Sequence, residues 1–311
     1  IEANPEITDY EYDQLYSELK KLEEQHPQFI SKDSPTQRVA PEPISYFKKI
    51  EHKAPMLSID NSYSLEEIEK FAKRIEKNLQ NIKLNDRTID YIIEPKIDGV
   101  AVSLWYEKGE LVKGITRGNG SVGEDVTSNI RTIRNIPLKL NTEDPPDFFE
   151  IRGEVYFTKK DFEKINEKRE KDNLIKFANP RNAAAGTLKL LDPKTVHERN
   201  LKFFAHNIGF NTSDFLKNHQ EAFKTFKEWG LPIIPNCQHA DNIKKVTQIC
   251  QNWEKQLQNL PYNIDGLVIK INNFEIREKL GHTAKAPRWI LAYKFFPKEV
   301  MTKLEDVMVQ I

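Results

Sequence analysis

A short charged run between two apolar, β-rich segments constrains this sequence more than any other feature. Residues 94–99 (EPKIDG) follow the apolar segment YII and precede VAVSLWY, which is rich in β-branched and aromatic residues. A strand that continues through the run places alternate side chains on one face, so Glu94, Lys96 and Asp98 should face the same way. The sequence therefore predicts an amine between two acids on a β-sheet.

Lys96 is either an ordinary surface lysine or a nucleophile. A surface role is the commoner one in a chain with 30% charged residues. An amine nucleophile must be neutral, whereas a lysine with the reference pKa of about 10.4 is charged at neutral pH in all but about one molecule in a thousand. Desolvation or nearby cations can lower the pKa of an amine. The nucleophile hypothesis therefore predicts further cations on neighbouring strands.

Composition indicates a folded, soluble protein without a global attraction to nucleic acid. The chain has 311 residues, 38% of them hydrophobic, with 47 Lys plus Arg and 47 Asp plus Glu. Any phosphate binding must therefore be local. Cys237 and Cys250 are too few for a Cys-rich zinc site and do not suit a secreted disulfide scaffold. Without a long apolar run or a signal peptide, we expect a cytoplasmic protein with no membrane partner.

The N-terminal region predicts a small helical module on a linker. Residues 9–25 carry apolar side chains at helical spacing. That stripe is explained by packing, but Asp9, Tyr12 and Asp13 also cluster on about one turn and could hold a cationic or polar ring. Residues 34–43 contain three prolines and predict a linker.

The main domain is expected to begin with a helix whose capping box is Ser64 with Glu67. A hairpin follows at residues 100–106 and 111–116. It leads into the glycine-rich segment 117–125, expected to be a turn that enters a helix. Such a turn is either an ordinary tight turn or a close approach to phosphate or ribose, with Arg117 as the candidate contact.

Further along, residues 149–157 alternate cleanly and predict a strand that carries Glu154. A helix capped by Thr158 and a tight helix within residues 177–187 are expected next. Arg181 and Lys189 are either solvated or in contact with phosphate. Two amphipathic helices, near residues 214–229 and 241–259, look purely architectural.

Two apolar strands near the C-terminus carry lysines. Residues 265–271 (DGLVIKI) place Val268 and Lys270 on one face, and residues 287–296 (PRWILAYKFF) carry Lys294 among aromatic side chains. A lysine inside an apolar strand is costly unless it is paired or given an anionic ligand. These two lysines are the cations that a neutral Lys96 requires.

Together these segments resemble, in order and composition, the successive motifs of covalent nucleotidyltransferases: DNA ligases, RNA ligases and mRNA capping enzymes. The strings at residues 33–39 (DSPTQRV), 116–120 (TRGNG) and 179–186 (NPRNAAAG) are similar to those of bacterial NAD-dependent DNA ligases. The chain departs from that family at Asn119, where Asp is usual, and at Lys189, where Arg is usual. The resemblance covers almost the whole chain.

The resemblance implies that Lys96 attacks the α-phosphorus of NAD, expels nicotinamide mononucleotide and becomes lysyl-AMP. The other roles that it implies are a catalytic Asp98, Lys270 and Lys294 on the α-phosphate, Glu94 at the adenine amine, Val268 against the base, Arg117 and Glu154 at the ribose, the backbone of Ser58 and Ile59 beside the nucleotide, and Asp9, Tyr12 and Asp13 at the nicotinamide mononucleotide. It also implies Mg²⁺, with ligands that the sequence does not assign.

The expected fold is α+β: an antiparallel-sheet, ATP-grasp-like ligase core with helices outside. Residues 1–55 should form the truncated helical module and linker, 56–297 the adenylation domain, and 298–311 the start of an OB domain. The late start and abrupt end predict a fragment, with any zinc site beyond it. We expect a monomer whose full-length parent seals nicks in duplex DNA, which this chain should grip weakly.

Two alternatives remain open on the sequence. The first is an ATP-dependent polynucleotide ligase or capping-type enzyme with the same core, which the acidic and aromatic cluster in the first helix disfavours. The second is a catalytically silent nucleotide-binding scaffold, which the joint presence of Lys96, Glu154, Lys270 and Lys294 disfavours.

Overall fold

The computed structural model describes residues 9–31, 33–38, 44–80, 82–84, 88–213, 215–253 and 260–295; side chains at positions 9, 10, 12 and 13 are outside this description. Within the described part, no helix is both long enough and apolar enough to span a bilayer. Three sheets form the framework of the described residues, and all of their strand pairs are antiparallel apart from one short parallel pair between β2 (Asn61–Ser62) and β11 (Ile290–Lys294). The expected α+β class with antiparallel sheets is confirmed.

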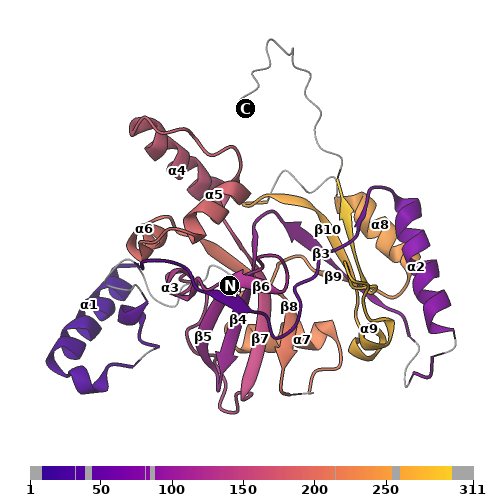
Figure 1. Cartoon of the computed structure of the whole chain (residues 1–311), viewed down its shortest axis with the longest axis horizontal. Helices are drawn as coiled ribbons and strands as arrows, with labels where there is room; N and C mark the ends of the chain where they lie inside the picture. Colours follow the sequence, from indigo (N-terminus) through magenta and orange to yellow (C-terminus); the bar gives the residue numbers. More distant parts are fainter. Residues whose placement is uncertain are drawn as a thin grey trace, which may run out of the picture.

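The N-terminal segment forms helix α1 (Asp9–Gln25) and two 3-10 helices, η1 (Pro27–Phe29) and η2 (Pro35–Gln37). The predicted helix over residues 9–25 is therefore confirmed. Arg38, directly after η2, donates hydrogen bonds to the backbone carbonyls of Arg131, Ile133 and Ile136 at 3.0–3.4 Å. This contact ties the segment to the four-stranded sheet region, beside which α1 lies in Figure 1.

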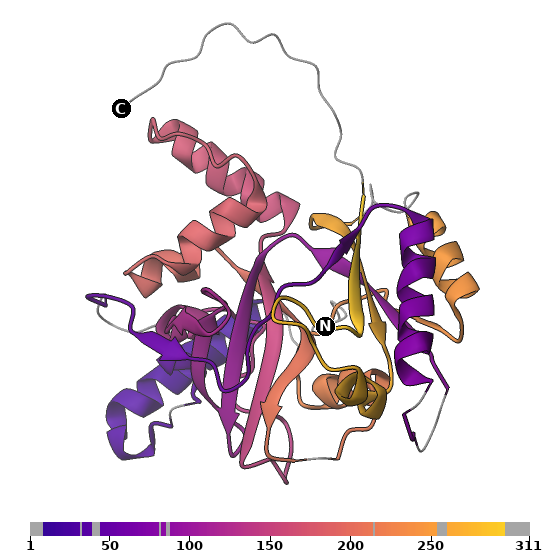
Figure 2. The same ribbon diagram turned by 45° about the vertical axis from the view of Figure 1, so that its right-hand side comes forward.

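The five-stranded sheet has the order β2 (Asn61–Ser62), β11 (Ile290–Lys294), β10 (Ile264–Ile271), β3 (Tyr91–Ile97), β9 (Gln238–Ala240). Its outer face is covered by α2 (Leu65–Leu79), α8 (Ile243–Trp253) and α9 (Phe274–Leu280) (Figure 1 and Figure 2). Ile93 is fully buried in the core on that face. Because side chains alternate along a strand, Glu94 and Lys96 lie on the face of β3 opposite to Ile93.

Helix α2 shows why the local sequence folds as expected. The Ser64 hydroxyl accepts the Glu67 backbone N–H at 3.3 Å, while the Glu67 carboxylate accepts the Tyr63 backbone N–H at 2.7 Å. These bonds satisfy amide groups that a helix N-terminus leaves without partners. One face of the helix then buries Ile68, Phe71 and Ile75, as the spacing predicts.

The four-stranded sheet has the order β5 (Glu110–Thr116), β4 (Val100–Glu107), β7 (Phe148–Tyr156), β8 (Lys202–Asn211). Around it lie helices α3 (Thr127–Arg131), α4 (Lys159–Lys171), α5 (Pro180–Leu188), α6 (Pro193–Glu198) and α7 (His219–Glu228). Its core includes Phe149, Phe203 and Phe226. The predicted hairpin, the Thr158 cap and the small-residue helix are all confirmed.

Three local expectations need correction or limits. The glycine-rich segment does not lead directly into a helix: it turns from β5 into β6 (Val122–Glu124), which pairs with β1 (Lys49–Glu51). Helix α7 begins at His219 and not near residue 214, because the Asn218 side chain caps it by accepting the Glu221 N–H at 2.9 Å. Residues 254–259 of the second expected helix lie outside the described residues.

Candidate active site

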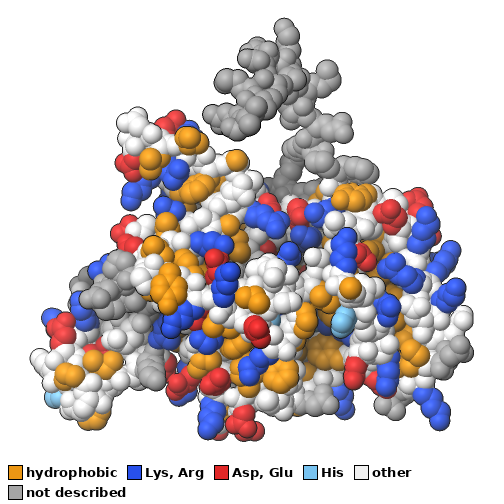
Figure 3. Space-filling view, in the orientation of Figure 1, with side chains coloured by type: hydrophobic (Ala, Val, Ile, Leu, Met, Phe, Trp, Pro, Cys, Tyr) orange, Lys and Arg blue, Asp and Glu red, His pale blue; other side chains and the backbone are white. Residues whose placement is uncertain are grey.

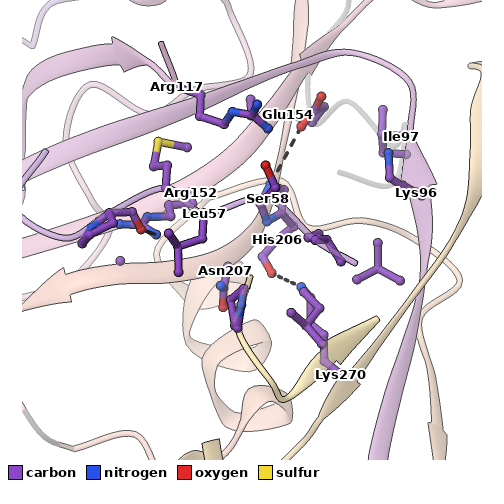
Figure 4. A pocket seen from close by; sticks show the side chains of 18 of the residues that line it. Leu57, Ser58, Lys96, Ile97, Arg117, Arg152, Glu154, His206, Asn207 and Lys270 are labelled. Carbon is purple, nitrogen blue, oxygen red and sulfur yellow. Dashed lines mark hydrogen bonds and ion pairs between the residues drawn. The ribbon is translucent and has the colours of Figure 1, made fainter. Parts of the chain in front are cut away.

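A cleft of about 1110 Å³ lies between the two larger sheets. Strands β3, β10 and β11 form one side, and β7 and β8 form the other. The turn between β5 and β6 and the segment 54–61 close it. Figure 4 shows part of this lining. The cleft brings together most of the residues expected from the sequence, namely Ser58, Ile59, Glu94, Lys96, Arg117, Glu154, Val268, Lys270 and Lys294.

Strand register places Lys96 and Lys294 in one cross-strand row. Gly266 of β10 is directly opposite Lys96 of β3 on one side and Lys294 of β11 on the other. A Cβ atom at Gly266 would lie 2.2 Å from the Tyr293 carbonyl oxygen and 2.9 Å from the Lys294 Cα. Only glycine fits there, and it leaves the two lysines with no side chain between them.

One carboxylate binds both lysines of this row. The Lys96 Nζ atom is 2.9 and 3.0 Å from the two oxygens of Asp265, and the Lys294 Nζ atom is 3.5 Å from one of them. Glu94 and Lys96 both line the cleft, as the alternation predicts, but the ion-pair partner of Lys96 is Asp265 and not Glu94 or Asp98. Asp98 lies beyond the end of β3, so the alternation of that strand does not extend to it, and its carboxylate is 3.8 Å from Arg181.

Glu94 is buried on the cleft wall between two nitrogen donors. Its carboxylate is 2.8 Å from the Lys270 Nζ atom and 2.6 Å from the His219 Nε2 atom, and both ionisable side chains are at most 2% exposed. Burial would raise the pKa of Glu94, but Lys270 and His219 outweigh it and lower that pKa to about 2. Burial also lowers the pKa of Lys270, and the Glu94 charge opposes this shift.

Lys270 has a partner that the sequence did not predict. Its Nζ atom also donates to the His206 carbonyl oxygen at 2.5 Å (Figure 4). Lys270 is opposite Ile92 on β3, two residues before Glu94, so its side chain reaches along the strand to the carboxylate. In this structure Lys270 therefore neutralises Glu94, and it is Lys294 that approaches the Lys96 site.

Glu154 contributes a second carboxyl group on the opposite wall. Burial, opposed by Lys96 and Arg181, raises its pKa from the ordinary 4.5 to about 8. Its Oε2 atom is 3.9 Å from His206 Nε2, and burial lowers the pKa of His206 to about 3, so that imidazole is neutral. Burial and the neighbouring Asp265 likewise raise the pKa of Asp98. Glu154 and Asp98 thus resist ionisation.

The segment before β2 is fixed as one wall of the cleft. Arg152 of β7 donates to the carbonyl oxygens of Ala54 and Pro55 at 2.6 and 2.9 Å, and its Nε donates to buried Glu150 at 2.8 Å. Lys53 lies over the Phe148 ring at 4.2 Å from the centroid. These contacts hold the backbone that continues into Ser58 and Ile59, which line the cleft.

Three residues that the sequence argument did not single out organise this site. Asp265 directly precedes Gly266 at the start of the apolar segment that carries Lys270, and this acidic residue was a usable signal. Arg152 alternates with Glu154 on β7, which was also visible. His219 gave no local signal, because its partner Glu94 is 125 residues away in the chain.

The remaining expected residues fall in two groups. Arg117 is an exposed residue of the cleft rim, at the β5–β6 turn. Asp9, Tyr12 and Asp13 belong to α1, but their side chains lie outside the described residues. Among the residues that the structure does describe, no group of three His, Cys, Asp or Glu side chains forms a ready-made metal site.

Comparisons with known proteins agree with this geometry. The family profile of the NAD-dependent DNA ligase adenylation domain matches residues 44–298, and that of the DNA ligase-like N-terminal NAD⁺-binding domain matches residues 1–40. A "DNA ligase" of Methylacidiphilum infernorum is 44% identical over all of this chain and 44% of its own length. One from Desulforamulus reducens is 44% identical over 99% of this chain and 45% of its own length.

The chain thus spans less than half the length of these curated relatives. A solved "Archaeal ATP-dependent RNA ligase" aligns with 78% of this chain and 48% of its own, at 14% identity and a TM-score of 0.41, a likeness too weak to support a conclusion. The family matches, in contrast, cover most of the sequence and every described wall of the cleft. The chain belongs to the NAD-dependent DNA ligase family, as its adenylation domain preceded by its N-terminal NAD⁺-binding domain.

Proposed function

We propose that Lys96 is the nucleophile that takes AMP from NAD. The observation that carries this proposal is the position of its amine inside the cleft, one glycine away from Lys294 and bound to Asp265. In the reaction an N–P bond forms, the bond between the two phosphates of NAD breaks, and nicotinamide mononucleotide leaves with the electron pair. Protons from the nitrogen pass to the adjacent Asp265 carboxylate or to water.

Lys294 and Lys270 are the proposed ligands of the α-phosphate. Transfer at phosphorus depends mainly on positioning and on neutralising the charge of the non-bridging oxygens. Lys294 already lies in the row of the nucleophile. Lys270 must leave Glu94 to reach a phosphate, so nucleotide binding exchanges one anionic partner of this amine for another.

The nucleoside site is proposed to lie between the Glu94 wall and the Glu154 wall of the cleft. Glu94 would accept from the adenine amine, and Val268, which faces Glu94 across the strand pair, would pack on the base. Arg117 and Glu154 would hold the ribose. The fixed wall at Ser58 and Ile59 would lie beside the nucleotide.

Mg²⁺ would be held by Asp98 together with phosphate oxygens. Oxygen ligands suit this cation, which commonly binds to one or two carboxylates plus substrate phosphates. A cation beside Asp98 would favour its ionised form, because burial and the neighbouring Asp265 raise the pKa of this group. The ion would supply charge neutralisation during phosphoryl transfer.

For the whole protein we propose the full reaction of an NAD-dependent DNA ligase, the sealing of 5′-phosphate, 3′-hydroxyl nicks during replication and repair. Basic residues of the cleft rim, Arg117, Arg181 and Lys189, support a phosphate-rich partner, and a band of Lys and Arg side chains crosses the same face in Figure 3. Asp9, Tyr12 and Asp13 would bind the nicotinamide mononucleotide half. The proposed domains are the helical module and linker at residues 1–55, the adenylation domain at 56–297 and the start of an OB domain at 298–311. We propose that the protein is a cytoplasmic bacterial monomer.

Intact-mass spectrometry tests the nucleophile. The chain is mixed with Mg²⁺ and either NAD or ATP, and the expected result is an added mass of one AMP with NAD alone. Lys96→Arg keeps the positive charge and should show no adduct. An adduct that persists in Lys96→Arg would overturn the assignment of the nucleophile, and an adduct with ATP alone would overturn the choice of donor.

A further inference from the structure

His219 supports Glu94 from behind the cleft wall. It is the first residue of α7 and is fully buried, and it does not line the cleft. Its backbone N–H donates to the carbonyl and side-chain oxygens of Asn272 at 3.0 and 3.1 Å, and Phe223 packs on its ring at a centroid distance of 4.4 Å. Backbone and ring are both fixed, so the Nε2 atom is held 2.6 Å from Glu94.

The direction of this hydrogen bond follows from the charges. Burial and the nearby Lys270 charge lower the pKa of His219 to about 3, so the imidazole is neutral and has a single N–H. Glu94 is ionised and can only accept. The proton is therefore on Nε2, which donates, while Nδ1 has no hydrogen-bond partner within the described part of the chain.

His219 becomes the essential donor when the cleft is occupied. The proposed function moves Lys270 from Glu94 to a phosphate, and Glu94 then keeps only the His219 N–H among the two donors it has now. A buried carboxylate without donors takes up a proton. A protonated carboxyl group donates as well as accepts, and it would no longer distinguish an amine from a carbonyl.

We propose that His219 is a positioning residue that keeps the Glu94 carboxylate ionised and aimed into the cleft, and so determines its preference for a purine with an exocyclic amine. This inference rests on the proposed function. It assigns an effect on substrate choice to a residue outside the cleft. A carboxylate repels the carbonyl oxygen that replaces the amine in hypoxanthine, so an ionised Glu94 should disfavour that base.

The test compares NAD with nicotinamide hypoxanthine dinucleotide, in which a carbonyl replaces that amine. The kcat/KM of AMP or IMP transfer is measured with each dinucleotide and expressed as a ratio. The wild-type chain should prefer NAD by on the order of 100-fold, since a buried acceptor that loses its donor is strongly unfavourable. His219→Leu, which removes the donor but keeps the bulk, should lower the ratio by about 10-fold or more.

A conservative variant separates positioning from packing. His219→Gln retains an N–H of similar reach and should restore most of the ratio, whereas the shorter amide of His219→Asn should not. His197→Leu is the matched control, since His197 is a partly buried histidine of α6 outside the cleft, and its ratio should equal that of the wild type. Thermal unfolding establishes that each variant is folded, and if His219→Leu is not, the Gln and Asn variants decide.

Each outcome has one meaning. An unchanged ratio in folded His219→Leu, or equal ratios in the Gln and Asn variants, overturns the inference. A wild-type chain that uses both dinucleotides equally also overturns it and leaves the proposed nucleophile intact. A wild-type chain that forms no adduct with either dinucleotide overturns the proposed function, and the inference falls with it.

Discussion

The amine of Lys96 donates to both carboxylate oxygens of Asp265, at 2.9 and 3.0 Å. The same carboxylate is 3.5 Å from the amine of Lys294. The two lysines, which face one another across Gly266, therefore share one carboxylate as their counterion. This arrangement places the Lys96 amine in an ion pair, which must break before the amine can act as a nucleophile.

Asp265→Asn should slow AMP transfer. The amide keeps the shape of the side chain but removes the charge that holds the amines of Lys96 and Lys294, so the two lysines repel each other and the nucleophile is less well positioned. We expect the single-turnover rate to fall about 10-fold or more. Asp241→Asn, at an exposed ion pair with Lys245, is the control. A rate equal to that of the wild type would contradict this account.

Lys270→Met should destabilise the fold by about 3 kcal/mol at neutral pH, because it removes one partner of a buried ion pair. Urea unfolding measures this change. Adding Glu94→Gln should recover part of the loss, since the buried charge is then gone. Lys245→Met, which breaks an exposed pair, should cost less than about 1 kcal/mol. Equal losses in the single and double variants would rule out the ion pair as the cause.

Acid should weaken the wild-type fold through Glu94. Its pKa is lowered from 4.5 to about 2 in the folded chain, so its stabilising contribution is complete above pH 4.5 and is lost as the pH falls through about 2. In Lys270→Met the pKa of Glu94 should rise toward its ordinary value. The free energy of unfolding of this variant should therefore fall less steeply with acid in that range, and a slope as steep as the wild type would contradict the prediction.

Glu154 should have the opposite effect on stability. Its folded-state pKa is raised from 4.5 to about 8, so its contribution is complete below pH 4.5 and is lost as the pH rises through about 8. Glu154→Gln removes this ionisation. Near pH 8 its free energy of unfolding should therefore fall by about 1 to 3 kcal/mol less than that of the wild type. Glu228→Gln, an exposed carboxylate of α7, should follow the wild-type pH profile. Parallel profiles for Glu154→Gln and the wild type would count against the raised pKa.

Arg152→Ala should weaken NAD binding more than it slows the chemical step. It removes both hydrogen bonds that hold the backbone of Ala54 and Pro55 as a wall of the cleft. We expect the KM for NAD to rise about 10-fold, with a smaller change in kcat. Free guanidinium should lower the KM again, and Arg134→Ala, an exposed arginine outside the cleft, should match the wild type. A loss confined to kcat would exclude a role in forming this wall.

Sequence patterns predicted the elements because each depends on neighbours in the chain. The alternation along 91–97 and the spacing of Ile68, Phe71 and Ile75 are local, and the structure has the strand and the helix that they indicate. The same patterns identified the lysines of three separate strands. All three lysines line one cleft, so their joint membership of a site was also predictable.

Side-chain partners were less predictable because they depend on strand register and on packing between distant elements. Alternation alone put Lys96 between Glu94 and Asp98, but pairing of β3 with β10 brings Asp265 to the amine instead. The helix that begins at His219 was expected to be purely architectural. Its first residue also contacts Glu94, because capping by Asn218 and the hydrogen bonds to Asn272 place this imidazole at the carboxylate.

The shared carboxylate of Asp265 also binds the two amines that are proposed to meet a substrate phosphate. A stray sulfate or free phosphate finds both amines of the row already satisfied and must compete with a tethered anion at very high local concentration. A dinucleotide that competes for the same amines also makes contacts through its base, its sugar and its second phosphate. The charged row therefore admits a phosphate only when the rest of the molecule that carries it also binds.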